Sequence, residues 1–361
     1  MNPRHVLLIA RSFHANGPGN VVSSLLRGWR AGDLRVSLAV LSPEGALRPE
    51  WEREVERLGG RLVVEPAGFF SAGKAAARLA PRFADIDVIT AHLIVPDAVG
   101  RALAIRWRRP LLVVEHGIHG WSEKGALLRP FVARWYRTSL PPNSRIAAVS
   151  PKVERELRSA GLPASRVTVI ENGVADMAGG AVGEYTFDTP TVGVVGNLIE
   201  AKRPLLALEA AAAAGRILGR RIAVAFCGDG PLEEPLRRAA AALGVEAHFA
   251  GRVTDPRPFY GAVTALVHPS RQESFGLAPL EALTVGLPVV ASATSGLAEL
   301  LPPRPSAWLV GDESPRAWGA ALADALTTSA DAQARKNWVA ERYSVERMVE
   351  GHRRALLELG G

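Results

Sequence analysis

The sequence predicts an α/β protein made of two tandem doubly wound, Rossmann-like domains that face a cleft. Short apolar runs alternate with segments of helical periodicity, and this pattern stops in a glycine-rich stretch and then starts again. The length of 361 residues suits two domains of about 100–200 residues each. We therefore expect an N-terminal domain at 1–177, a linker at 178–190 and a C-terminal domain at 191–340. A terminal helix is expected at 341–361, and it either stays with the second domain or crosses back to the first.

Buried strands are expected wherever an apolar run of three to seven residues is bounded by turn residues. In the first domain these runs lie at 5–10, 35–41, 87–91, 110–115 and 145–149, and in the second at 191–195, 222–226, 247–249, 265–268 and 288–291. The helices between them include an alanine-rich one at 204–217 and one from about Leu277 to Val285, which Gly286 ends. In such sheets ligands bind at the carboxyl ends of the strands.

The composition excludes several classes of protein. With 48% hydrophobic and 22% charged residues the chain is not disordered, and its single cysteine, Cys227, excludes a disulfide framework and a cysteine-based zinc site. No apolar run approaches the roughly 18–20 residues that span a bilayer. The first apolar core, Val6 to Ala10, is too short for a signal peptide. We expect a soluble, cytoplasmic protein.

The positive charge is concentrated in one stretch. The net charge is +7, and residues 101–150 hold nine basic side chains against two acidic ones: Arg101, Arg106, Arg108, Arg109, Lys124, Arg129, Arg134, Arg137 and Arg145. A helix here would place Leu127, Leu128, Phe131, Val132 and Trp135 on one face and arginines on the other. Two interpretations stay open: a helix that packs on the sheet, or one that docks through 101–145 on the anionic inner face of a membrane. A nucleic-acid partner is not expected, because no such motif is present.

The stretch 265–290 carries the strongest signal for chemistry. A loop with Glu273 and Gly276 joins a strand to the helix start, whose free amides favour a phosphate. Glu281 lies eight residues after Glu273, about 12 Å if all were helical, beyond the ~5–9.5 Å of a glycosidase pair. The two acids therefore suit the sugar and ribose ends of one elongated ligand, with its diphosphate on the helix. The alternative is that both are ordinary solvated side chains.

Several motifs resemble those of retaining GT-B glycosyltransferases of the family 4 or group 1 type. The pair Glu273 and Glu281 looks like their Glu-x7-Glu signature, and similar stretches occur in the same order at 149–151, 171–174, 193–203, 226–231, 250–253 and 295–299. The resemblance covers nearly the whole chain, most strongly in 190–300. It implies a GT-B fold and transfer of a sugar from a nucleotide-diphospho sugar to an acceptor hydroxyl, with retention of anomeric configuration.

The resemblance also implies roles for single residues. Glu273 would contact the donor sugar, Lys202 would neutralise its diphosphate, and His116 would face the sugar as a third catalytic residue. The other donor-binding positions are Asn197, Arg203, Gly228, Gly230, Arg252, Val253, Arg271, Ser274, Phe275, Gly276, Leu277, Glu281 and Glu299. Asn197 departs from the family, which usually has arginine there, and either Arg203 or Arg271 is a candidate to supply the missing charge.

In the first domain a glycine-rich loop follows the first strand. Gly17, Gly19 and Asn20 form either an acceptor or diphosphate loop or a plain strand-to-helix turn. His92, at the end of the strand 87–91, is expected to face the acceptor or to be merely structural. His116 and His119 have metal-ligand spacing, but no third ligand lies nearby in the sequence, so we expect no metal and no cofactor.

The sequence therefore predicts a metal-independent, retaining glycosyltransferase of the EC 2.4 class. We expect it to act in cell-envelope polysaccharide, glycolipid or secondary-glycoside synthesis, on a saccharide, lipid-linked or small-molecule acceptor. Because Asn197 is neutral, the alternative is a non-catalytic GT-B module that binds a sugar nucleotide or a partner subunit.

Overall fold

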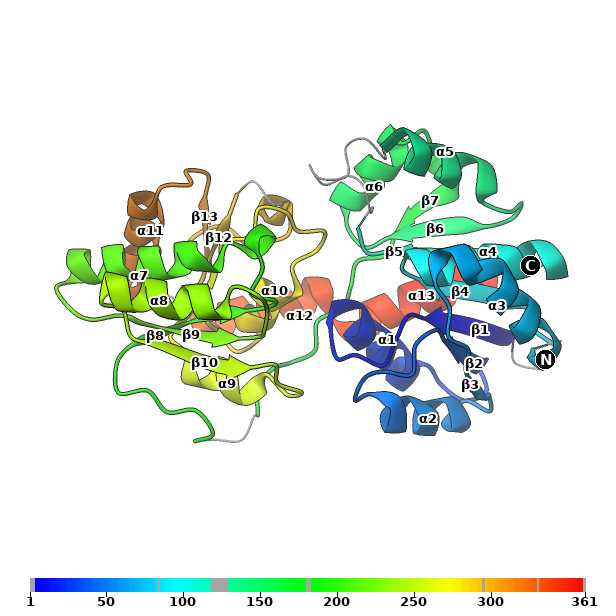
Figure 1. The fold of residues 1–361 in the computed structure, drawn as a ribbon, viewed down its shortest axis with the longest axis horizontal. Coiled ribbons are helices and arrows are strands. Elements are labelled where there is room, and N and C mark those ends of the chain that lie inside the picture. The colour runs from blue at the N-terminus through cyan, green and yellow to red at the C-terminus, as the bar shows by residue number, and fades with distance from the viewer. Residues whose placement is uncertain are drawn as a thin grey trace. The chain divides into compact units, whose positions relative to one another are not determined.

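The computed structural model describes residues 4–83, 85–117, 129–179, 183–293, 296–329 and 331–359, which form two compact units (Figure 1). The first unit comprises Met1–Gly173 and Val345–Gly361, and the second Val174–Ser344. Each unit is a parallel sheet with helices in its crossovers, so the predicted α/β fold class of two Rossmann-like domains is confirmed.

The sheet of the first unit has seven parallel strands in the order β3-β2-β1-β4-β5-β6-β7. The strands are β1 (Arg4–Ala10), β2 (Leu34–Val40), β3 (Leu62–Val64), β4 (Val88–His92), β5 (Leu111–Glu115), β6 (Arg145–Ala148) and β7 (Val167–Val169). The helices are α1 (Gly17–Gly28), α2 (Arg48–Arg57), α3 (Ala72–Leu79), α4 (Ile94–Trp107), α5 (Arg129–Ser139), α6 (Pro151–Ser159) and α13 (Val345–Leu359). The strand order reverses between β1 and β4, which is where such sheets bind ligands.

The second unit repeats the plan with six parallel strands in the order β10-β9-β8-β11-β12-β13. The strands are β8 (Thr191–Val195), β9 (Ala223–Cys227), β10 (Ala247–Gly251), β11 (Ala265–His268), β12 (Val289–Ser292) and β13 (Ala307–Val310). The helices are α7 (Pro204–Leu218), α8 (Glu233–Leu243), α9 (Arg257–Ala262), α10 (Leu277–Thr284), α11 (Pro315–Thr327) and α12 (Ala332–Tyr343). Trp308 and Trp318 are fully buried in this core. The reversal of strand order falls between β8 and β11.

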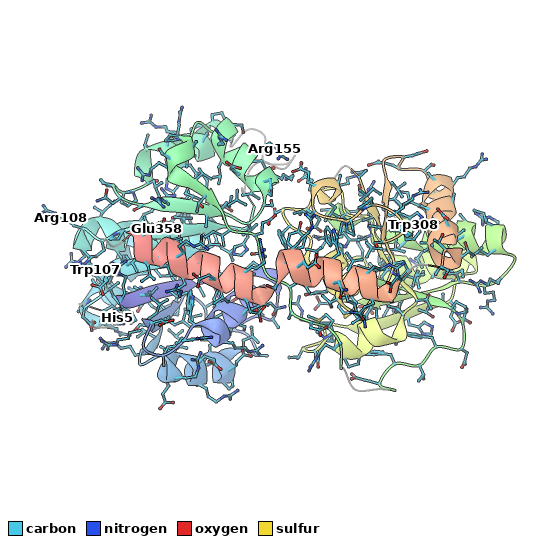
Figure 2. All side chains as sticks on the ribbon, turned by 180° about the vertical axis from the view of Figure 1, so that it is seen from behind. His5, Trp107, Arg108, Arg155, Trp308 and Glu358 are labelled. Atoms are coloured by element: carbon cyan, nitrogen blue, oxygen red, sulfur yellow. The ribbon has the colours of Figure 1, made fainter. Side chains whose placement is uncertain are left out.

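The helical tail of the chain is split between the units. Helix α12 belongs to the second unit, whereas α13 belongs to the first, where it contacts α1, β4 and β5. Nη1 of Arg4 donates to the carbonyls of Leu356, at 3.0 Å, and Leu357, and Arg145 of β6 pairs with Glu358 at 2.9 Å. Figure 2 shows Glu358 at the end of this helix. The first unit is therefore built from two segments that are distant in the sequence.

The unit boundaries differ from those expected at 177 and 340. Val174 already belongs to the second unit, because its N–H donates to the carbonyl of Tyr343 at 2.7 Å. The described parts of the expected linker, residues 178–179 and 183–190, also fall in the second unit. The ring of Tyr185 meets Phe259 edge-on at 5.7 Å, and Phe187 packs on the same small core cluster. These aromatic side chains are the reason that the segment is not a free linker.

The basic amphipathic helix expected at 127–137 is α5, although Lys124, Leu127 and Leu128 lie outside the described residues. Its aromatic side chains differ in burial: Tyr136 is buried, whereas Phe131 is 72% exposed. Trp135 lies against the guanidinium of Arg101, which is 4.3 Å from the ring centroid. The apolar face is therefore only partly covered by the part of the first unit that is described.

Candidate functional site

The second unit has a helix N-terminus open to a ligand at the carboxyl edge of its sheet. Strand β11 ends at His268, and α10 begins at Leu277 after a loop. Its N-cap, Gly276, has φ +85°, and a Cβ there would lie 2.3 Å from Leu297, so only glycine fits. Gly276 has no side chain with which to cap the helix. A helix start without a side-chain N-cap favours an anion, and an anion site at this position stays a prediction from the sequence.

Glu273 stands in that loop and is paired with two nitrogens. Nζ of Lys202 donates a hydrogen bond to its Oε1, and Nε2 of His268 lies 2.8 Å from the same oxygen. Burial alone raises the pKa of the Glu273 carboxyl, but the hydrogen bonds and charges of His268 and Lys202 outweigh it and lower the pKa to about 2. Glu273 is therefore a carboxylate at neutral pH, held in a fixed position.

Lys202 ends a short 3₁₀ turn, Glu200–Lys202, that follows β8. The next residue, Arg203, braces the loop that carries Glu273: its Nε donates to the carbonyl of Pro269 at 2.6 Å. Arg203 also pairs with Glu313 at 2.7 Å, and Arg271 lies 3.8 Å from the same carboxylate. Both arginines that were candidates to replace the missing charge at Asn197 are thus engaged with Glu313. Of Lys202, Arg203 and Arg271, the side chain that pairs with Glu273 is that of Lys202.

Three glycine turns close the carboxyl edge beside this loop. The N–H of Gly196 donates to the carbonyl of Cys227 at 3.0 Å, and that of Gly228 to Gly251 at 2.8 Å. A Cβ on Gly228 would lie 2.0 Å from the carbonyl oxygen of Gly196, and one on Gly230 would lie 2.5 Å from that of Leu198. The loops after β8, β9 and β10 therefore approach one another closely at these glycines, where the lack of a side chain also lets a ligand approach the backbone.

Glu281 lies on α10 and accepts a hydrogen bond from the hydroxyl of Tyr260 at 2.7 Å. Burial raises the pKa of the Glu281 carboxyl. Burial and the nearby Glu281 also raise the pKa of the Cys227 thiol to about 12, so this thiol stays protonated and is no nucleophile. Tyr260 was not foreseen, because an aromatic residue on a short helix has no distinctive sequence pattern.

The remaining predicted donor residues line up along the same edge. Asn197 is exposed, and Arg252 pairs with Asp229 of the β9 loop at 2.8 Å. Phe275 is buried edge-on against Tyr343 at 5.5 Å. Val253 follows β10, and Ser274 lies in the loop before α10. Leu277 is the first residue of α10, and Glu299 ends a 3₁₀ turn after β12.

In the first unit, the structure brings two predicted histidines together. Nδ1 of His92, at the end of β4, lies 3.2 Å from Nε2 of His116, just after β5. His352 of α13, which sequence reasoning missed, stacks on His92 with ring centroids 6.0 Å apart. Its position late in the chain, far from any motif, gave no signal.

Gly17 and Gly19 fall in the first turn of α1, and Asn20 is exposed. The side chain of Asn16 caps this helix by accepting from the N–H of Gly19 at 3.0 Å. A Cβ on Gly19 would lie 2.0 Å from the carbonyl oxygen of His14. The glycine is thus required by the turn itself, whether or not a ligand binds there.

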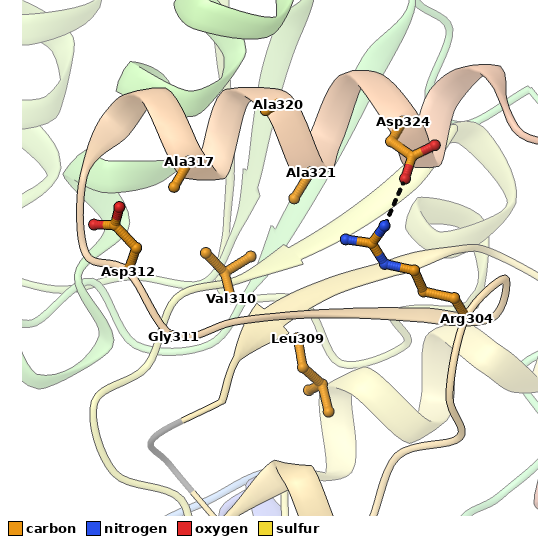
Figure 3. Close-up of a pocket in the computed structure, with 9 residues that line it drawn as sticks. All are labelled: Arg304, Leu309, Val310, Gly311, Asp312, Ala317, Ala320, Ala321 and Asp324. Carbon is orange, nitrogen blue, oxygen red and sulfur yellow. Dashed lines mark hydrogen bonds and ion pairs between the residues drawn. The ribbon is translucent and has the colours of Figure 1, made fainter.

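A separate cavity of about 350 Å³ lies beside α11 and β13 in the second unit (Figure 3). The ion pair of Arg304 with Asp324, 3.0 Å long, stands at one side, and Ala317, Ala320 and Ala321 form part of the wall. None of the predicted site residues lines it.

Among the described residues, no three His, Cys, Asp or Glu side chains are grouped so as to hold a metal ion. His119, which has metal-ligand spacing from His116 in the sequence, lies outside these residues. In the same parts of the chain, no helix has both the length and the apolar character needed to cross a membrane.

Two family models match the chain in sequence. Residues 15–176 match Glycosyltransferase Family 4, and residues 185–344 match Glycosyl transferases group 1. The D-inositol 3-phosphate glycosyltransferase of Corynebacterium glutamicum is 29% identical over 269 residues, which are 66% of this chain and 64% of that protein. The enzyme of the same name from Salinispora tropica is 30% identical over 302 residues, which are 74% of this chain and 61% of that protein. The chain thus matches less than two thirds of the length of either relative.

Solved structures share the fold across nearly the whole chain. The HepE protein of Anabaena in complex with UDP-glucose superposes with a TM-score of 0.79 at 18% identity, over 98% of this chain and 99% of that one. A glycosyltransferase from Rickettsia africae gives 0.76 at 14% identity, over 99% and 98%. The two parallel sheets define a protein of the GT-B class. Within that class, the chain belongs to the group 1 and family 4 glycosyltransferases.

Proposed function

We propose that the protein transfers a sugar from a nucleotide-diphospho sugar to an acceptor hydroxyl. The observation that carries the proposal is the arrangement in the second unit, where an ionised Glu273, paired with Lys202, lies in the loop before the open N-terminus of α10. A carboxylate suits sugar hydroxyls, and a lysine with helix amides suits a diphosphate. The donor would be held by the second unit and the acceptor by the first.

The leaving group in this reaction is a nucleoside diphosphate, which gains negative charge as the glycosidic bond breaks. Nζ of Lys202 carries three donors, so it can contact a phosphate oxygen while it still donates to Glu273. The first-turn amides of α10 would share that charge without moving. Stabilisation of a departing anion by fixed donors is typically the largest catalytic contribution.

Retention of configuration is part of the proposal. The acceptor oxygen would attack the anomeric carbon on the face from which the diphosphate departs. The bond from this carbon to the diphosphate breaks, and the acceptor proton passes to a phosphate oxygen of the leaving group. The charge would be neutralised by Lys202 and the α10 amides, without a metal ion. Comparison of the anomeric configuration of donor and product by NMR tests this step.

A thermal-shift panel of nucleotides and nucleotide sugars tests the donor class, since a ligand that binds the native state raises the melting temperature. UDP and UDP-glucose come first, because HepE was solved in complex with UDP-glucose. Stabilisation by a nucleotide sugar, with donor hydrolysis in the absence of acceptor, supports an enzyme. Stabilisation without any hydrolysis or transfer supports the non-catalytic alternative that Asn197 suggested.

Two observations each support a candidate class of acceptor. The relatives are named for D-inositol 3-phosphate, a phosphorylated polyol, which makes such polyols the first acceptors to assay. The exposed Phe131 and the exposed Arg134 and Arg137 on α5 favour a second candidate, a lipid-linked acceptor at an anionic membrane surface. Transfer to a soluble polyol and to lipid in vesicles distinguishes the two.

A further inference from the structure

Three histidine rings meet inside the first unit. His92 and His352 are each 1% exposed, and their rings are stacked at an interplanar angle of 18°. Within the described residues, Nε2 of His92 and both ring nitrogens of His352 are buried without a hydrogen-bond partner. Buried polar atoms without partners are rare and call for an explanation. The hydrogen bond of this cluster joins Nδ1 of His92 to Nε2 of His116 at 3.2 Å.

All three rings are neutral at pH 7. Burial lowers the pKa of His116 to about 4 and that of His352 to about 3, and it holds the pKa of His92 well below its ordinary value. A neutral imidazole has one N–H donor and one bare nitrogen. The bond between His92 and His116 therefore holds a single proton, which belongs to one ring or the other.

The burial of His92 decides between the two arrangements. If His116 donated, the proton of His92 would sit on Nε2, as a fully buried N–H without an acceptor. If His92 donates through Nδ1, only a lone pair is left unpaired on Nε2. Buried N–H groups without acceptors are rarer in proteins than acceptors without donors. The second arrangement is therefore favoured.

We propose that His92 is a positioning residue for His116. Its Nδ1–H donates to Nε2 of His116, so the proton of His116 sits on Nδ1, which becomes a hydrogen-bond donor to a substrate hydroxyl. His352 holds the His92 ring in the required orientation by stacking. This inference rests on the proposed role of His116 in glycosyl transfer, and it changes the expectation for His92, which is too buried to contact an acceptor itself.

The backbone after His116 is fixed as well. Oε1 of Glu115 accepts from the N–H of Gly117 at 3.0 Å, and its Oε2 accepts from the hydroxyl of Tyr136. The turn that carries His116 is thus tied to α5 through a buried carboxylate. With the ring held by His92 and the backbone by Glu115, His116 has a defined direction as well as a defined proton.

Nitrogen NMR of the full-length chain with ¹⁵N-labelled histidine tests the proton position directly, because protonated and bare ring nitrogens resonate far apart. The eight histidines are assigned through single variants. We expect His116 to show a protonated Nδ1 and a bare Nε2. A protonated Nε2 on His116 in the wild-type protein would overturn the proposal.

Two variants of His92 test its effect on the reaction. In His92→Phe a ring still stacks on His352 but the donor is gone, so we expect Nε2 of His116 to gain the proton and kcat to fall by about 10- to 100-fold, the loss typical when a partner that orients a functional histidine is removed. In His92→Asn the amide nitrogen can take the place of Nδ1, and kcat should recover in part. Unchanged His116 shifts and kcat in His92→Phe would refute the positioning role.

A matched pair at His352 tests the stacking. His352→Phe keeps an aromatic face and should leave the His116 spectrum unchanged, whereas His352→Ala should give two tautomers. Equal spectra for both variants would remove His352 from the proposal.

Failure of the proposed function gives a different set of results. In that case no nucleotide sugar stabilises the protein, or His116→Ala has normal turnover, while the nitrogen spectra of the wild type are as expected. Normal turnover of His116→Ala also ends the role of His92 in the reaction.

Discussion

Nζ of Lys202 donates a hydrogen bond to Oε1 of Glu273, although 71 positions separate these residues in the sequence. They come from the crossovers after β8 and β11, the two strands at which the sheet order reverses. Neighbouring strands with opposite crossovers leave a crevice at their carboxyl ends, and functional side chains gather there. The pair therefore places an anionic and a cationic side chain next to each other at this crevice.

Glu273→Gln is expected to reduce transfer by about 100- to 1000-fold, the range seen when one fixed polar contact to a transition state is lost. The fold should persist, because glutamine can still accept from Lys202 and the side chain is not part of an apolar core. Initial rates with saturating donor, together with the melting temperature, measure both effects. Glu233→Gln, which changes a carboxylate that pairs with Arg237 on α8, serves as the control. Turnover equal to that of the wild type would remove Glu273 from the mechanism.

Lys202→Ala should weaken binding of a nucleoside diphosphate far more than binding of the nucleoside. Truncating one member of a buried charged contact costs about 2–5 kcal/mol. Titration calorimetry with UDP and uridine compares the two losses. Lys152→Ala on α6, which also removes a lysine from an ion pair with glutamate, is the control. Equal losses for nucleoside and diphosphate would contradict a role in charge neutralisation.

The pH dependence of stability should change in Glu115→Gln. Burial raises the pKa of Glu115 to about 7, above its unfolded value of 4.5. Between these values the native state binds a proton that the unfolded state has released, so this group lowers the free energy of unfolding as pH rises through the window. Relative to the wild type, Glu115→Gln should therefore gain stability from pH 4.5 to 7. Urea unfolding at several pH values measures the difference, and a difference independent of pH would contradict the raised pKa.

Activity should survive chelation. In the proposed mechanism Lys202 and the α10 amides neutralise the diphosphate, so no step needs a divalent cation. The measurement is the transfer rate after dialysis against EDTA, with and without added manganese. Loss of activity that manganese restores would show that a metal ion takes part.

The membrane candidate can be tested with vesicles of defined charge. Binding through exposed Arg134 and Arg137 should require anionic lipid and weaken as salt rises, because surface attraction is screened within about 8–10 Å at physiological ionic strength. Phe131→Ser should reduce binding further, since its side chain is 72% exposed. Co-sedimentation at low and high salt gives the answer. A protein that ignores anionic vesicles at low salt uses a soluble acceptor.

All ten strands expected from the sequence are present, and three others were missed: β3 (Leu62–Val64), β7 (Val167–Val169) and β13 (Ala307–Val310). Each is an edge strand of its sheet. Central strands are covered on both faces, so their sequences are continuous apolar runs. Edge strands are short and partly exposed, so their sequences show a weaker apolar pattern. The periodic pattern identifies the interior of a sheet better than its rims.

The sequence predicts the anion site of the second unit better than the histidine cluster of the first unit, because a sequence pattern detects only residues that lie close together in the chain. The loop with Glu273 and the start of α10 are contiguous in sequence, so the order of residues is enough to indicate an anion site. His268, the neighbour of Glu273, belongs to the same contiguous stretch, whereas the contact of His352 with His92 depends on tertiary packing. His352 in particular comes from a helix that follows the entire second unit, and no local pattern connects it to β4.

The placement of α13 also has a consequence for synthesis of the chain. Multidomain proteins commonly fold domain by domain as they leave the ribosome, the N-terminal one first. Here the helix that packs on β4 and β5 is translated only after residues 174–344. Most of the first unit is therefore translated early, but its last helix is translated only at the end. Until then α13 does not cover the side of the sheet around His92. Translation that stops inside the second unit therefore leaves both units incomplete.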